Sequence, residues 1–255
     1  MIKKIYRKIK SKFFKKSFGT QNAQNRNNWL KSALDDIPSG STILDAGAGN
    51  GNKKKYCKNL NYISQDIAEY KGTSKREGLH TGIVDYSELD IVSDIVDIPL
   101  DDESIDAIMC IEVIEHVEDP LLVFNEFSRL LKKDGILILT APFNSLTHYS
   151  PYHYATGFSK FYYQKNLPKF NFEIVNIEPN GNYFEYFAQE TRRINEVSET
   201  YSNKKIYNPF YYLSRIYMLN LLRKLSEKDN GSSELLCFGY NVLAKKIWIY
   251  QWEKI

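Results

Sequence analysis

The stretch Ile43-Leu44-Asp45-Ala46-Gly47-Ala48-Gly49-Asn50-Gly51 decides the fold. Apolar or small residues run into three glycines spaced two apart, which predicts a buried strand that ends in a tight turn. Glycine is kept at such a turn for a positive φ or for the close approach of a ligand to the main chain. In α/β sheets, this turn is where the polar part of a nucleotide-like cofactor binds. A glycine turn without a ligand is the alternative.

The spacing of the glycines separates two cofactor classes. A dinucleotide site has the pattern G-x-G-x-x-G, whose third glycine would fall at position 52, where the chain has Asn52. The chain instead has G-x-G-x-G, with the acid Asp45 two places before the first glycine. This arrangement resembles motif I of the class I S-adenosylmethionine (SAM) methyltransferases.

Two further acids stand at the ends of predicted strands. Residues 62–66 predict the second strand, with Asp66 at its carboxyl end. An acid there can accept hydrogen bonds from both ribose hydroxyls of an adenosine, although a turn after the strand is a plainer role for it. Residues 89–95 predict the third strand, which Asp94 ends.

Two longer segments extend the resemblance to about residues 26–180. Residues 94–108 resemble the D-x-x-x-L/I-P-F/L-x-x-x-S-F/I-D run of small-molecule SAM methyltransferases. Residues 112–120 read Glu-Val-Ile-Glu-His-Val-Glu-Asp-Pro and resemble the E-V-I/L-E-H-V-x-D-P signature of the same enzymes.

The order of predicted elements indicates an α/β fold. Strands and helices alternate at the spacing of βαβ units, whose right-handed crossovers build a parallel sheet. The resemblance implies a Rossmann-like, seven-stranded, mostly parallel sheet with an antiparallel last strand, helices on both faces and a helical insertion before the last strand. The remaining predicted elements are short helices over 29–34 and 52–60, a long loop over 70–88, strands over 107–111, 136–140, 172–177 and 235–249, and a helix over 121–133 closed by Asp134 and Gly135.

By resemblance, SAM is the cofactor and a set of residues binds it. The glycine loop would cradle the methionine portion, Asp66 the ribose, and Asp94 with the following amide the adenine. The main chain after the fourth strand would close over the methionine amino group, and an arginine would pair with the methionine carboxylate. The complete set is Arg26, Asp45, Gly47, Gly49, Gly51, Asp66, Ile67, Asp94, Ile95, Cys110 and Ile111.

Methyl transfer is an in-line displacement at a sulfonium, so alignment of the reactants is the main requirement. A base matters where the acceptor must lose a proton, and histidine suits that role near neutral pH. The candidates are His116, His148 and His153, near the carboxyl ends of the fourth and fifth strands. The alternatives are that His116 caps or buttresses its helix and that His148 or His153 only binds substrate. Their spacing matches no metal-binding pattern, so no metal is expected.

Charge separates one end of the chain from the rest. Residues 1–16 hold eight Lys or Arg and no acid, whereas the remainder has 26 basic against 31 acidic residues. An acidic body argues against a nucleic-acid partner. Residues 1–19 predict a basic amphipathic helix, for which contact with an anionic membrane face and packing on the domain are both open. The three scattered cysteines and the lack of a ~20-residue apolar run predict a cytoplasmic protein without disulfides.

The chain is therefore expected to have the basic helix over 1–19, a loop over 19–28, and one methyltransferase domain over 20–255 with a helical insertion at about 182–230. The insertion holds two predicted helices that could cover the acceptor pocket, form a homodimer face or lie at a membrane. The expected function is methyl transfer from SAM to an oxygen of a small or glycan-linked acceptor, by resemblance in bacterial capsule polysaccharide biosynthesis. An amine acceptor and a non-catalytic, membrane-associated scaffold are the alternatives.

Overall fold

The computed structural model describes residues 18–72, 77–79 and 82–247. The predicted basic helix over 1–19 therefore lies outside the described residues, apart from its last two positions. The chain forms two compact units, each treated by itself below. One comprises Arg26–Pro179 and Gly239–Ile255, and the other comprises Met1–Asn25 and Asn180–Phe238.

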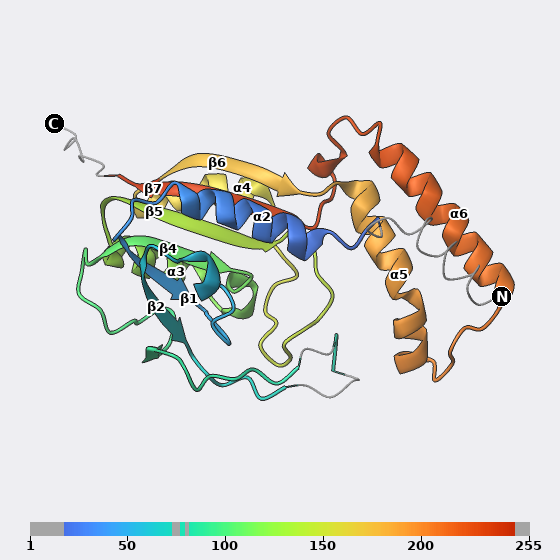
Figure 1. Ribbon diagram of the computed structural model, residues 1–255, viewed down its shortest axis with the longest axis horizontal. Helices are drawn as coiled ribbons and strands as arrows, with labels where there is room; N and C mark the ends of the chain where they lie inside the picture. The colour runs from blue at the N-terminus through green and yellow to red at the C-terminus, as the bar shows by residue number, and fades with distance from the viewer. Residues whose placement is uncertain (1–17, 73–76, 80–81, 248–255) are drawn as a thin grey trace. The chain divides into compact units, whose positions relative to one another are not determined.

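The larger unit is built on a seven-stranded sheet of order β3-β2-β1-β4-β5-β7-β6 (Figure 1). Strands β1 to β5 are parallel to their neighbours, and β7 runs antiparallel to β5, which confirms the predicted fold class. From β1 the chain adds β2 and then β3 on one side of the sheet. It then crosses over to form β4 on the other side of β1. Such a reversal leaves a crevice at the carboxyl ends of β1 and β4. The strands are β1 (Thr42–Ala46), β2 (Asn61–Asp66), β3 (Ile91–Val92), β4 (Ile105–Ile111), β5 (Leu131–Pro142), β6 (Phe172–Asn180) and β7 (Gly239–Lys246).

Both faces of the sheet are buried. Ile43 of β1 and Met109 of β4 pack against α2 (Asn22–Asp35), which crosses the front of the sheet in Figure 1. Because side chains alternate along a strand, Leu44 and Ile108 point to the opposite face, and they too are fully buried. The other helical elements of this unit are α3 (Pro120–Leu130), α4 (Lys160–Asn166), η1 (Lys54–Tyr56), η2 (Ile114–His116) and η3 (Leu167–Phe170).

Helix α2 is longer than predicted, since the expected loop over 19–28 is helical from Asn22 onward. Asparagine has a weak helix propensity, which is why the sequence indicated a loop. Three α2 residues are buried against the sheet, and that burial outweighs the propensity of the polar first turns. The buried residues are Leu30, Ala33 and Leu34.

The predicted end of the helix over 121–133 was wrong. Helix α3 ends at Leu130, and Leu131 already pairs with Ile105 of β4. The positive φ of Asp134, 64°, therefore lies inside β5 rather than at a helix stop. Leu131 is fully buried in β5, so its pairing with the sheet is accompanied by the removal of its apolar surface from water.

Two other predicted elements are shorter than expected. The helix over 52–60 is a single 3-10 turn, η1, and the third strand is reduced to Ile91–Val92. The carboxylate of Asp90 accepts hydrogen bonds from the amide and hydroxyl of Ser64, at 2.8 and 2.7 Å. A side chain thus takes the place of a backbone partner and delays the start of β3.

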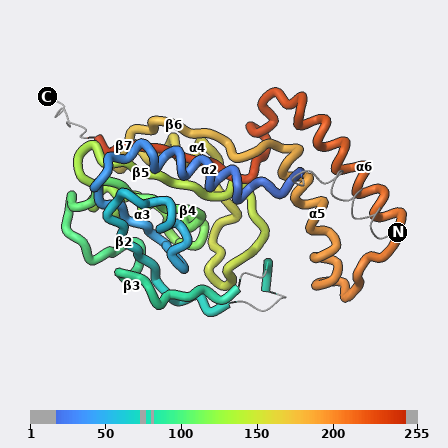
Figure 2. The backbone as a smooth tube through the Cα atoms, viewed as in Figure 1, coloured from blue at the N-terminus to red at the C-terminus, as the bar shows by residue number. Residues whose placement is uncertain are grey.

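The described part of the segment between β2 and β3, residues 67–72, 77–79 and 82–90, has loop structure, in agreement with the loop predicted for 70–88 (Figure 2). Its described residues form no helix. Leu79 forms an isolated β-bridge with His148. This bridge joins the loop to the segment that follows β5.

The smaller unit contains the two helices predicted for the insertion, α5 (Tyr183–Tyr201) and α6 (Pro209–Ser226), followed by η4 (Ser232–Glu234). Asn182 and Glu185 form a capping box that begins α5. Ala188 of α5 packs with Leu219 and Leu222 of α6. Among the described residues, no helix has the length and apolar character needed to cross a membrane.

Candidate functional site

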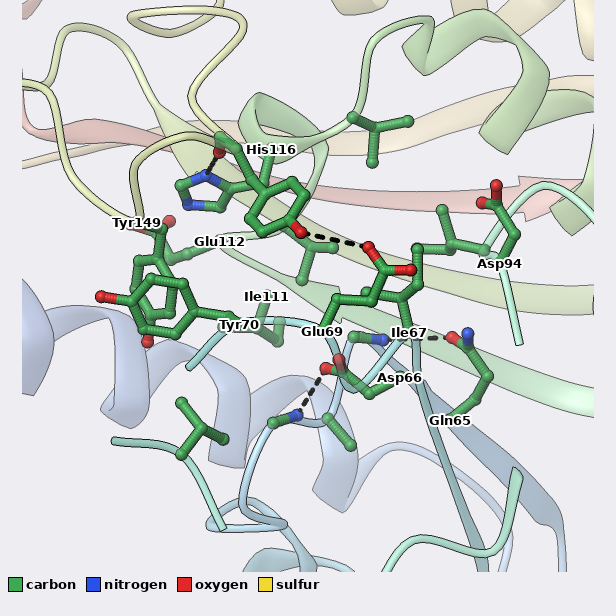
Figure 3. Close-up of a pocket in the computed structure, with 18 of the residues that line it drawn as sticks. Gln65, Asp66, Ile67, Glu69, Tyr70, Asp94, Ile111, Glu112, His116 and Tyr149 are labelled. Atoms are coloured by element: carbon green, nitrogen blue, oxygen red, sulfur yellow. Dashed lines mark hydrogen bonds between the residues drawn. The ribbon is translucent and has the colours of Figure 1, made fainter. Parts of the chain in front are cut away.

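A cavity of about 910 Å³ opens at the carboxyl ends of β1, β2 and β4, within the larger unit (Figure 3). Its volume lies in the range of small-molecule and cofactor sites. In the view of Figure 3, Asp94 lies at one end of the cavity, and His116 and Tyr149 lie at the other. The predicted site residues that line it are Arg26, Gly47, Gly49, Asp66, Ile67, Asp94, Ile95, Ile111, His116 and His148.

The glycine turn predicted after β1 is present and needs glycine. Gly47 has a φ of 77°, and a Cβ built there would lie 2.4 Å from Cγ2 of Val113. The amides of Gly47 and Ala48 donate to the carbonyl of Gln65, at 2.9 and 2.8 Å. The loop is therefore fixed between the ends of β2 and β4, with its backbone open to the cavity.

Asp66 links the end of β2 to this loop. Its Oδ2 accepts from the amide of Gly49 at 2.9 Å, and its Oδ1 accepts from the amide of Ala68 at 3.0 Å. A carboxylate has about four lone-pair sites, so two are left for a ligand. Figure 3 shows the carboxylate of Asp66 on the wall of the cavity.

Asp94 and Ile95 form the adjoining wall beyond β3. Asp94 is exposed, and its Oδ1 accepts from the amide of Val96 at 3.2 Å. Ile95 is buried and lines the cavity. The wall thus pairs an acceptor oxygen with an apolar surface, which suits a flat, polar-edged ring.

Two cations and an acid meet beside the glycine loop. Nη1 of Arg26 donates to Oε2 of Glu112 at 2.9 Å, and Oε1 of Glu112 accepts from the hydroxyl of Thr140 at 3.0 Å. Lys53 also lines the cavity, and its pKa is lowered by burial and by Arg26. This corner of the cavity can therefore bind a ligand that carries both a positive and a negative group.

Three predicted cofactor-binding residues, Asp45, Gly51 and Cys110, are not among those that line the cavity. Asp45 is 2% exposed, and its Oδ2 accepts from the hydroxyl of Tyr62 at 2.6 Å. Burial raises the pKa of Asp45 to about 6. The side chain of Asp45 thus supports the strand beneath the loop, and that of Cys110 is buried in the sheet.

The other end of the cavity is aromatic. The rings of Tyr70 and Tyr149 lie 4.4 Å apart between centroids, and those of His116 and His148 lie 4.7 Å apart. His153, which is not among the lining residues, lies 5.0 Å from His148 by the same measure. The structure thus brings together all three predicted catalytic histidines, from η2 and from the segment after β5.

Backbone contacts hold this segment in place. The amides of Tyr154 and Ala155 donate to the carbonyl of Glu115, at 3.0 and 3.1 Å. Nδ1 of His116 donates to the carbonyl of Tyr152. The segment from 152 to 155 is thereby fastened to η2 on both sides of His153.

Burial governs the charge of the groups at this end. It lowers the pKa of His116 to about 4, so that this imidazole is neutral near pH 7. Burial also lowers the pKa of His153. The carboxyl of Glu115 is completely buried, and burial raises its pKa well above the usual range.

Several lining residues were missed by sequence reasoning. Lys53 follows the glycine turn directly, and its position was the available signal. The aromatic lining from the long loop had no such signal, because that loop has no periodicity to place its side chains. The missed residues include Lys53, Glu69, Tyr70, Val84, Tyr86, Glu112, Tyr149 and Tyr152.

Known proteins resemble the chain over the sheet and glycine loop. Residues 44–139 match a sequence profile described as "Methyltransferase domain". The chain is 29% identical over 115 residues to a ubiquinone biosynthesis O-methyltransferase of Haemophilus ducreyi, covering 43% of this chain and 49% of that protein. It is 32% identical over 108 residues to the protein of the same name from Xanthomonas axonopodis pv. citri, covering 40% and 44%. The chain thus spans less than half the length of either relative.

Solved structures extend the likeness of the fold. Phosphoethanolamine N-methyltransferase 2 from Haemonchus contortus, in complex with SAM, has a TM-score of 0.51 and 17% identity over 88% of this chain and 53% of that one. At this identity the likeness concerns the fold alone. The matched segment, the strand order and the glycine loop agree with one another. Residues 44–139 therefore carry a methyltransferase domain, within a fold like that of the SAM-dependent class I enzymes.

Proposed function

We propose that the protein transfers the methyl group of SAM to an oxygen of a small or saccharide acceptor. One observation carries the proposal: a single cavity joins the glycine loop and the acids after β2 and β3 to a cluster of histidine and tyrosine side chains. The first group has the chemistry to hold an adenosyl cofactor. The second has the chemistry to receive a nucleophile.

In this proposal the cofactor extends along the cavity. Asp66 accepts from the ribose hydroxyls with its two remaining lone-pair sites, and the adenine lies against Ile95 with Asp94 at its edge. The methionine portion lies on the glycine loop, its carboxylate near Arg26 and Lys53. Lining acids such as Glu112 offset the positive charge of the sulfonium.

The reaction exchanges one bond for another. A lone pair on the acceptor oxygen forms the new bond to the methyl carbon, while the carbon–sulfur bond breaks and its electron pair stays on sulfur as S-adenosylhomocysteine. Holding the reactants in line can account for several kcal/mol of the barrier. An acceptor hydroxyl must also lose its proton, and the imidazole of His116, which lines the cavity and is neutral near pH 7, is available to take it.

The acceptor class has weaker support than the cofactor. The curated relatives are O-methyltransferases by name, which favours oxygen over nitrogen. The resemblance to bacterial surface-polysaccharide enzymes favours a sugar hydroxyl, as in capsule biosynthesis, at the inner face of the membrane. The tyrosine-rich wall fits a sugar, since aromatic rings offer both an apolar face and hydroxyl groups.

A panel of acceptors tests the proposal. The protein is incubated with SAM and fractionated nucleotide-sugars, capsule precursors and amino sugars, and products are followed for a gain of about 14 Da, one methyl group replacing one hydrogen. The proposal expects O-linked methyl groups and one S-adenosylhomocysteine per product. Methylation confined to amines would replace it with an N-methyltransferase. A protein that binds neither SAM nor S-adenosylhomocysteine in calorimetry would instead be a non-catalytic scaffold.

A further inference from the structure

The three histidines at the acceptor end place their ring nitrogens close together. His116, His148 and His153 each offer a nitrogen, and these nitrogens all lie within 4.8 Å of one another. The residues are 32 and 5 positions apart along the chain, so the grouping arises from the fold and from no local spacing. Imidazole nitrogens gathered in this way are typical ligands of divalent transition metals.

A fourth group points into the same cluster. Oε1 of Glu115 lies 3.7 Å from Nε2 of His116 and 3.9 Å from Nε2 of His148. The side chain of Glu115 is 1% exposed, and neither of its carboxylate oxygens is hydrogen-bonded to another of the described residues. A buried carboxyl group without partners is costly, and such a group calls for a specific explanation.

The hydrogen bonds of two histidines fix which nitrogen faces this carboxylate. Nδ1 of His116 donates to the carbonyl of Tyr152, and Nδ1 of His148 donates to the carbonyl of Leu146 at 2.9 Å. Because a carbonyl only accepts, each neutral ring carries its proton on Nδ1 and a lone pair on Nε2. Both lone pairs are thus presented to the oxygen of Glu115. Metal-bound histidines are held in the same way, with the other nitrogen donating to a carbonyl.

His153 adds the third nitrogen in an equally unsatisfied state. Both of its ring nitrogens are buried and have no hydrogen-bond partner among the described residues. The His153 ring is tilted by 59° relative to the His148 ring, with 5.0 Å between the ring centroids. Two imidazole lone pairs, a third imidazole without hydrogen bonds and a buried carboxyl group thus converge at one place.

We propose that His116, His148, His153 and Glu115 bind one divalent transition metal ion at the acceptor end of the cavity. Three imidazoles and a carboxylate form a ligand set of the kind that zinc takes, with cobalt, iron and manganese as chemical relatives. Ligand atoms around tetrahedral zinc lie about 3.3 Å apart, given bond lengths near 2.0–2.1 Å. The present separations are 3.7 and 3.9 Å from Glu115 to two of the imidazoles and up to 4.8 Å between the imidazole nitrogens, so metal binding needs the side chains to close in by up to about 1.5 Å per pair.

The metal would sit in the wall of the cavity. His116 and His148 line the cavity, whereas Glu115 and His153 do not, so a fifth ligand would reach the ion from the cavity side by expanding its four-coordinate shell. That fifth position suits an acceptor oxygen, whose pKa a bound metal lowers. The role in catalysis depends on the proposed function, but metal binding itself does not.

Metal titration tests the site directly. Tag-free protein is stripped with a chelator, and Zn²⁺ or Co²⁺ is added while calorimetry and the visible d–d absorption of Co²⁺ are recorded. One equivalent should bind, with a spectrum typical of nitrogen and oxygen ligands. Glu115→Gln and His148→Ala should each weaken binding at least about tenfold, as loss of a ligand requires.

Glu118→Gln is the matched control, because Glu118 lines the same cavity three residues further on but is not part of the cluster. It should bind the metal as the wild type does. SAM affinity is measured on the same stripped samples, to separate this proposal from the methyltransferase function. Normal SAM binding with no stoichiometric metal, or equal metal binding in all variants, would overturn the metal site. Metal binding without SAM binding would instead overturn the proposed function.

Discussion

The two ends of the cavity are built differently. At the glycine-loop end, backbone amides and strand-end acids satisfy one another: Gly47 and Ala48 bond to Gln65, and Gly49 bonds to Asp66. At the histidine end, buried polar atoms of Glu115 and His153 have no partner among the described residues. The polar groups at the glycine-loop end are thus hydrogen-bonded to one another, whereas the histidine end holds buried polar groups that a bound ion or ligand would satisfy.

This difference indicates where binding and chemistry should separate. The glycine-loop end positions a cofactor through rigid elements, so changes there should act on SAM affinity. The histidine end faces the reacting methyl group in the proposed arrangement, so changes there should act on turnover. Four substitutions can break or sharpen this division, from the largest expected effect to the smallest.

His153→Ala should reduce kcat about 100-fold or more, because it removes a ligand of the proposed metal, and help with removing the acceptor's proton typically contributes 10²–10⁴-fold. The affinity for SAM, measured by calorimetry, should stay within about threefold of wild type, since His153 does not line the cavity. A normal turnover rate would remove His153 from the proposed machinery. An equal loss of SAM affinity and of turnover rate would contradict the division, because it would mean that the histidine end also binds SAM.

Gly47→Ala should weaken SAM binding by about 30-fold or more, because the new Cβ would lie 2.4 Å from Val113 and would occupy a positive φ. Gly51→Ala is the matched control. It has a similar φ of 67° but meets no atom within 4 Å, so it bears about 1–2 kcal/mol of backbone strain alone. Equal affinity in the two variants would show that the contact with Val113 does not shape the loop.

Asp66→Asn should weaken SAM binding about tenfold, because hydrogen bonds to a charged group contribute about 1.5–3 kcal/mol each. The asparagine keeps one oxygen for the amide of Gly49 but loses acceptor capacity toward ribose hydroxyls. Asp94→Asn, at an exposed side chain, should have a smaller effect. The comparison fails if Asp94→Asn weakens binding more than Asp66→Asn does.

Asp45→Asn should change the pH dependence of stability rather than SAM binding. The folded pKa of Asp45, about 6, lies above the usual value of 3.8, so the folded state favours the neutral carboxyl. Wild-type stability should therefore fall, relative to the variant, as the pH rises through this range. Linkage gives about 1 kcal/mol between pH 5 and pH 7, measurable by denaturant unfolding.

Asp90→Asn provides the control for this pH effect. Hydrogen bonds from Ser64 lower the pKa of Asp90 from its usual value, so this carboxyl is ionised in both the folded and the unfolded state between pH 5 and pH 7. The stability difference between Asp90→Asn and wild type should be constant from pH 5 to pH 7. A constant difference for Asp45→Asn as well would mean that Asp45 is charged in the folded protein throughout this range.

The same division explains how far sequence reasoning reached. Strand ends are predictable because a buried run and its terminal residue are adjacent in sequence, so Gly47, Asp66 and Asp94 were found. Asp45 was expected to contact the cofactor, but it belongs to the strand itself, where its side chain turns into the sheet and meets Tyr62. The grouping of His116 with His148 and His153 depends on how the segment after β5 packs against η2. Their spacing along the chain does not predict this packing.

Secondary structure shows the same limit. Helix α2 was predicted too short because burial of Leu30 and Leu34 outweighs the weak propensity of its asparagines. Helix α3 was predicted too long because pairing of Leu131 with Ile105 is a contact between distant residues. Local signals thus fixed the existence of each element, whereas tertiary contacts fixed its ends.

The central claim is that one cavity binds SAM with the adenosine at the strand ends and the methyl group toward the histidines. A crystal structure of the protein with S-adenosylhomocysteine tests it most directly. We predict the ribose hydroxyls on Asp66, the adenine against Ile95 and the sulfur directed toward His116 and Tyr149. An adenosine bound beside the histidines, or a ligand bound outside the cavity, would contradict it.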